Sequence, residues 1–151
     1  MIIFELTLKQ LYLQSLMSRI RQKSDFNIDA AEKLLTLSLF APSVHCSYYS
    51  CFQLMKYALK SFWGLDYSTQ AANIVSTGKG THQYVIDFMS KELKVLAGKE
   101  ESRKFKRTIK DLRQFRLESD YDNVEIDSDM GSKAFIKAQE IRDYLIKNCQ
   151  V

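Results

Sequence analysis

Apolar residues recur along the chain at intervals of three and four, which is the spacing of one face of an α-helix. The clearest run follows Pro42, a residue that suits a first helical position because no hydrogen bond is lost there. Its apolar positions are Val44, Tyr48, Cys51, Met55, Leu59 and Phe62. A second flank of the same run carries His45, Tyr49, Phe52 and Lys56. We therefore expect this helix to be largely buried, with His45 as a hydrogen-bonded core residue.

A similar stripe precedes this run, and Ser24, Asp25 and Asn27 stand in its middle as candidate helix caps. The segment therefore predicts either one long helix or two short ones. Its apolar positions are Leu13, Met17, Ile20, Ile28, Ala31, Leu35 and Leu39.

Glycines and polar residues interrupt the pattern over residues 63–80, where we expect a short helical turn over residues 69–75. Thr81 is expected to cap the next helix, which should end at Gly98, and Ser132 marks the start of the last. The stripes of the last three helices are Val85, Met89, Leu93 and Leu96, then Phe105, Ile109, Leu112 and Arg116, then Ala134, Ala138, Ile141 and Leu145.

These patterns predict an all-α fold, an up-and-down bundle of four or five helices that forms one domain over residues 1–151. No apolar run is long enough to span a membrane, and no signal peptide is evident. The cysteines at 46, 51 and 149 have neither disulfide nor zinc spacing, which favours a reducing compartment. We expect a cytoplasmic protein without a metal or a cofactor.

Charge is unevenly distributed along the chain. Residues 91–116 contain ten Lys or Arg, whereas residues 118–129 contain six acids and no base. The basic run is either a solvated helix face or a surface that faces phosphate. Gly78 to Thr81 only superficially resemble a phosphate-binding loop, because Asn73 and Gly80 occupy positions where the motif needs glycine and a hydroxyl residue. Lys79, at a helix start, could still hold an anion.

Arg116 falls four residues after Leu112 in an apolar stripe, so we expect it at or near the buried face. A charge in that position needs a partner, and Asp120 lies one helical turn further on. Two interpretations stay open: an internal salt bridge that fixes the helix, or an arginine held in place to bind phosphate.

Three segments together resemble the HEPN superfamily of helical proteins that bind or cut RNA. They are residues 45–52 (HCSYYSCF), like the tyrosine-pair helix of that family, residues 81–86 (THQYVI), and residues 112–121 (LRQFRLESDY), which end in Arg-x-x-x-Asp-Tyr. The resemblance spans residues 25–148. It implies a homodimer, often encoded beside a minimal nucleotidyltransferase as a toxin–antitoxin pair.

Ribonucleases of that family place a histidine four to six residues after the arginine, in a cleft shared by two subunits. Here the arginine is Arg116, and residues 121–123 are Tyr, Asp and Asn. The motif is therefore degenerate, and a phenol is a poor base near neutral pH. Residual chemistry would fall to Arg116, Asp120 and Tyr121. Only His82, the weaker candidate, or His45 could substitute for the missing histidine.

The resemblance and the charge pattern together predict a nucleotide- or RNA-binding module, with Lys79, Lys110, Arg113 and Arg116 as the binding residues. One alternative is an active, metal-independent endoribonuclease toxin. The other is a non-catalytic dimeric adaptor or structural protein.

Overall fold

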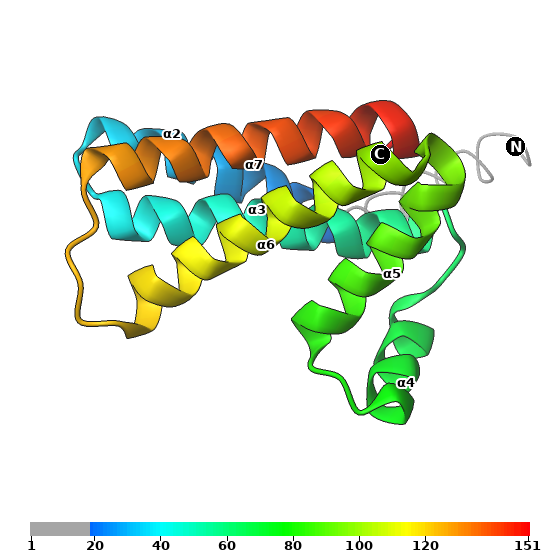
Figure 1. Cartoon of the computed structure of the whole chain (residues 1–151). Helices are drawn as coiled ribbons and strands as arrows, with labels where there is room; N and C mark the ends of the chain where they lie inside the picture. The colour runs from blue at the N-terminus through cyan, green and yellow to red at the C-terminus, as the bar shows by residue number, and fades with distance from the viewer. Residues whose placement is uncertain (1–18) are drawn as a thin grey trace, which may run out of the picture.

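The computed structural model describes residues 19–151, and every regular element in that range is an α-helix (Figure 1). The helices are α2 (Arg19–Thr36), α3 (Phe40–Ser61), α4 (Tyr67–Thr77), α5 (Thr81–Ala97), α6 (Lys99–Tyr121) and α7 (Ser128–Cys149). The predicted all-α class is confirmed for these residues. The predicted stripe positions Leu13 and Met17 lie outside the described residues.

Helix α3 is the centre of the molecule and packs against α2, α5, α6 and α7. In Figure 1, α2, α3 and α7 run side by side, and α6 crosses them obliquely. The short α4 stands at the outer end and packs mainly on α5. The predicted stripe of α3 is fully buried from Val44 to Leu59, but Phe62 stays 38% exposed. Each large apolar side chain buried in this way stabilises the fold by about 1.5–3 kcal/mol.

Helix α2 continues without a break through Ser24, Asp25 and Asn27, so over residues 19–36 the single-helix alternative is the observed one and these residues are not caps. Ser24 is buried, and its hydroxyl donates a hydrogen bond to the backbone carbonyl of Ser50, 2.6 Å away on α3. The polar side chains that suggested a helix end instead attach the middle of α2 to its neighbours.

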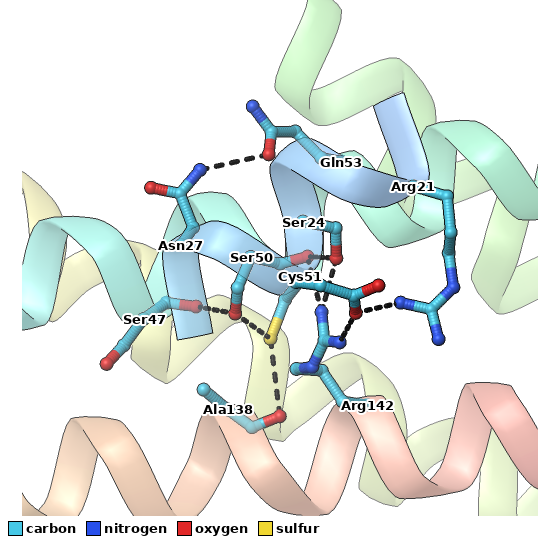
Figure 2. A network of polar contacts seen from close by, with 10 residues as sticks. Arg21, Ser24, Asn27, Ser47, Ser50, Cys51, Gln53, Ala138 and Arg142 are labelled. Atoms are coloured by element: carbon cyan, nitrogen blue, oxygen red, sulfur yellow. Dashed lines mark hydrogen bonds and ion pairs between the residues drawn. The ribbon is translucent and has the colours of Figure 1, made fainter. Parts of the chain in front are cut away.

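Arg142 of α7 is the centre of that attachment, as Figure 2 shows. Its guanidinium donates to the Ser24 hydroxyl, to the Ser50 carbonyl at 3.4 Å and to the carboxylate of Asp25 at 2.5 Å. Arg21 pairs with the same carboxylate from one turn away. A buried arginine therefore joins three helices, and its charge is balanced by Asp25.

Two predicted helix starts are wrong, for a local reason in each case. Gly80 is the N-cap of α5, so Thr81 is already inside the helix. Helix α7 begins at Ser128, four residues before the expected start, because the Asp127 side chain accepts a hydrogen bond from the Met130 N–H at 2.9 Å. Gly98 ends α5 with φ of 93°, in the left-handed region that favours glycine.

Two other predicted positions differ slightly from the structure. Pro42 is the third residue of α3 instead of the first, still within the turn whose N–H groups have no helical partner. Leu96, predicted to face inward, is 45% exposed. Among the helices of residues 19–151, none combines the length and apolar character that crossing a membrane requires.

Candidate functional site

Arg116 lies where α6 contacts α3, and it is only 5% exposed. Its guanidinium carbon is 5.2 Å from the ring centre of Tyr48 and 5.3 Å from that of Tyr49. One terminal nitrogen donates a hydrogen bond to the Tyr49 hydroxyl at 3.3 Å. The expected contact with Asp120 is present, with 3.7 Å between Nε and Oδ2. Aromatic faces and one carboxylate therefore hold this charge in place.

His45 approaches the same carboxylate from α3. Its Nδ1 is 2.9 Å from Oδ2 and 3.1 Å from Oδ1 of Asp120. The imidazole is hydrogen-bonded as predicted, but its placement in the core is wrong, because the side chain is 46% exposed. Oδ2 of Asp120 thus meets both Nδ1 of His45 and Nε of Arg116. His45 of α3 therefore shares a carboxylate partner with Arg116, although the residues that follow Arg116 on α6 include no histidine.

The second histidine is part of a more buried arrangement. The Tyr48 hydroxyl and Nδ1 of His82 are 2.7 Å apart, and the Phe52 ring centre is 4.2 Å from that of His82. Burial, together with the positive charges of Arg116 and Arg113, lowers the His82 pKa to about 4. Burial also raises the Tyr48 pKa above its ordinary value. His82 is therefore neutral at pH 7, and its Nδ1 is hydrogen-bonded to Tyr48. This arrangement suits a structural contact better than proton transfer.

An open groove lies beside the His45–Asp120 pair, with a volume of about 510 Å³. It is lined by Ala41, Pro42, His45, Cys46, Ser119, Asp120 and Tyr121. The Ser119 hydroxyl donates to the Ala41 carbonyl at 2.9 Å and so fixes the end of α6 to the start of α3. Tyr121 ends α6; its ring centre is 5.7 Å from the Arg116 guanidinium, yet the residue is 73% exposed. The groove is therefore lined by the ring of Tyr121 and the imidazole of His45, and the buried Arg116 lies against the Tyr121 ring.

One flank of α6 is basic along most of its length. At 100° per residue, six bases fall within about 120° of the helix circumference, with no acid of α6 between them. We call them the basic flank: Lys99, Arg103, Lys106, Arg107, Lys110 and Arg113. Lys106 pairs with Asp87 of α5 at 3.3 Å, and Arg113 donates to the Gln83 side chain at 3.0 Å.

The remaining four members of the basic flank are exposed, and none forms an ion pair with a residue in 19–151. The Asp87 carboxylate pairs both with Lys79, at 2.9 Å, and with Lys106. Lys79 therefore lies close to the basic flank. The four predicted binding residues therefore differ in accessibility. Lys110 is exposed, Lys79 and Arg113 are bonded to side chains of α5, and Arg116 is buried.

The cysteines do not provide a nucleophile at neutral pH. Burial raises the pKa of Cys51 to about 12 and that of Cys149 to about 11. Burial, followed by the Asp120 charge, also raises the pKa of Cys46, which lines the groove. All three thiols therefore stay protonated near pH 7.

Comparisons of the chain with models of known protein families, with characterised proteins and with solved structures found no match.

His45 is the residue that the sequence pattern placed incorrectly. Its partner Asp120 is 75 positions away, and no local spacing connects the two. The available signal was that His45 and Tyr49 are four residues apart on α3, on the flank that faces Arg116.

Proposed function

We propose that this chain is a HEPN-like protein that binds single-stranded RNA along the basic flank of α6 and in the adjoining groove. The observation that carries the proposal is the flank itself. Its bases stand three and four positions apart, so neighbouring like charges each destabilise the helix by about 0.2–0.5 kcal/mol. Only Lys106 has a carboxylate partner on α5. A polyanion would offset this repulsion along the whole flank, whereas the described fold supplies a carboxylate only at Lys106.

The length of the surface favours RNA over a single nucleotide. Eighteen residues separate Arg103 from Tyr121, which corresponds to about 27 Å at 1.5 Å per residue. A nucleotide would fill only the groove, whereas a strand can contact the groove and the flank together. The exposed Tyr121 ring supplies a face on which a base can stack, an interaction worth about 1–3 kcal/mol.

The arrangement of the molecule in this proposal follows the HEPN resemblance. The long helices α2, α3, α5, α6 and α7 make the up-and-down bundle, and α4 is an appendage. Two copies form a homodimer in the cytoplasm, and a minimal nucleotidyltransferase is the partner in a toxin–antitoxin pair. Support for self-association comes from large apolar side chains that stay exposed, such as Phe26 at 69% and Leu37 at 67%.

The test is a titration of fluorescently labelled single-stranded RNA at two salt concentrations. Wild-type affinity should fall steeply as salt rises, because bound phosphates release counterions. Arg107→Glu/Lys110→Glu should weaken binding and reduce the slope of log affinity against log salt by about 1.4, because each phosphate contact on a single strand contributes about 0.7.

The matched control carries the same charge change on a different helix. Lys133→Glu/Lys147→Glu alters two exposed lysines of α7 and should bind almost as the wild type does. No binding by the wild type at low salt would reject the proposal and favour the non-catalytic dimeric adaptor. Equal losses in the two double variants would show that only net charge matters.

A further inference from the structure

We infer that a cavity between α6 and α7 binds the ammonium end of a small alkylamine through two aromatic rings, a phenol oxygen and two carboxylates. The cavity has a volume of about 60 Å³. It lies between the first half of α6 and the second half of α7, which are side by side in Figure 1. Pockets for drug-sized ligands begin at about 300 Å³, so this volume suits only the end of a short chain.

The cavity is remote from the surface proposed for RNA. At 100° per residue, the α6 side chains that line it lie on the side of the helix opposite the basic flank. Fourteen residues separate Phe105, in the cavity, from Ser119, in the groove, which corresponds to about 21 Å at 1.5 Å per residue. The inference is therefore independent of the proposed function.

Two aromatic rings contribute to the lining. The ring centres of Phe105 and Tyr144 are 5.8 Å apart, and the rings are inclined by 35°. Ile141 lines the same cavity and is buried, as is Phe105. The face of an aromatic ring attracts a cation, and the apolar side chains can cover the alkyl chain that carries it. An alkylammonium therefore matches this part of the lining with both its charge and its chain.

The Tyr144 hydroxyl supplies a hydrogen-bonding oxygen. This oxygen is buried, and no residue in 19–151 forms a hydrogen bond with it. Burial, followed by the charge of Glu101, raises the pKa of Tyr144 above its ordinary value. The hydroxyl is therefore neutral near pH 7, and a carboxylate lies close to it. A buried oxygen of this kind needs a partner, and an ammonium N–H can donate to it.

Charge decides the class of ligand. Glu101 of α6 and Glu140 of α7 place carboxylates on both helices, and neither forms an ion pair with a residue in 19–151. Lys104 also lines the cavity and is exposed, so its long side chain can keep its ammonium in solvent. Two carboxylates against one lysine favour a cation over an anion.

The experiment titrates the ¹⁵N-labelled full chain with n-butylammonium chloride, with ionic strength held constant by sodium chloride. Backbone amide shifts report the site, and the wild type should show saturable changes over residues 101–108 and 140–144. The neutral probe n-butanol has the same alkyl chain and should bind at least about 5-fold more weakly, because it lacks the charge.

Variants test the groups one class at a time. Tyr144→Phe keeps the ring but removes the oxygen, and should weaken binding by about 10-fold through loss of a hydrogen bond to a charged group. Glu101→Gln/Glu140→Gln should weaken binding by about 5-fold. The matched control, Glu100→Gln/Asp143→Asn, makes the same charge change on the same helices at exposed residues outside the lining. This control should bind as the wild type does.

Lys104→Gln removes the opposing charge from the lining and should tighten binding by about 2-fold. Equal affinities for n-butylammonium and n-butanol would overturn the inference, because charge would then play no part. Equal losses in the two double variants would also overturn it, as would shifts that do not saturate or that lie outside the two segments. Tighter binding of Nα-acetyl-lysine amide than of n-butylammonium would reassign the site to a lysine side chain. A failure of RNA binding would leave this inference unchanged.

Discussion

At the scale of single residues, the fold contains two nearly buried arginines that are held in different ways. Arg142 has an ion partner and two neutral oxygens within hydrogen-bonding distance, so its charge is compensated. Arg116 also has an ion partner, Asp120, but at 3.7 Å, and it makes one hydrogen bond to Tyr49 while its buried Nε makes none. A buried nitrogen satisfied this incompletely needs an explanation, and its place beside the Asp120 carboxylate that also holds His45 provides one.

Removing Arg142 should therefore destabilise the protein. Arg142→Ala leaves Ser24 and Asp25 without their common partner and opens a gap between α2, α3 and α7. We expect a loss of about 2–4 kcal/mol in the free energy of unfolding, measured by urea denaturation. Arg21→Ala removes the more exposed partner of Asp25 and should cost less than about 1 kcal/mol. Similar losses in the two variants would contradict the assigned role.

His82 should make stability depend on pH. Its pKa is lowered from 6.5 to about 4 by burial and by Arg116, Arg113 and Lys56. Between these values the unfolded chain binds a proton that the folded chain does not, so stability falls as pH decreases from 6.5 towards 4. Urea denaturation of wild type and His82→Gln at several pH values measures this effect. The variant should lose less stability over that window, and parallel curves would contradict the prediction.

At the scale of helices, hydrophobic spacing was enough to locate most of the elements. The buried stripes of α3, α6 and α7 were predicted because each depends only on residues three and four apart. Ser24 was misread as a cap because its partner, the Ser50 carbonyl, belongs to another helix. The His45–Asp120 contact was missed for the same reason. Local periodicity carries no information about which side chains meet across the bundle.

The start of α7 provides a direct test of capping. Asp127→Ala removes the side-chain acceptor for the Met130 N–H and should destabilise the protein by about 1 kcal/mol. The matched variant is Asp129→Ala, two residues further on, which leaves the cap in place and removes an exposed pair with Lys133 and a first-turn acid near the helix N-terminus. Thermal or urea denaturation should show the larger loss for Asp127→Ala. A larger loss for Asp129→Ala than for Asp127→Ala would contradict the assignment of Asp127 as the N-cap of α7.

At the scale of the whole molecule, a basic surface adjoins a groove within one chain, and the proposed homodimer brings two such surfaces together. The basic flank of α6 leads towards Tyr121, so one strand can contact both features. Light scattering at micromolar concentration should give twice the chain mass of 17.6 kDa. A monomer mass would reject the homodimer, and the RNA surface of one chain would then have to act alone.

The most direct test of the account is to map where RNA contacts the protein. Nuclear magnetic resonance spectra of ¹⁵N-labelled protein, recorded during titration with single-stranded RNA, report on each backbone amide. The account predicts shift changes over residues 99–121 and around His45, with little change on the outer face of α7 near Lys133. Shift changes confined to α7, or none at saturating RNA and low salt, would contradict it.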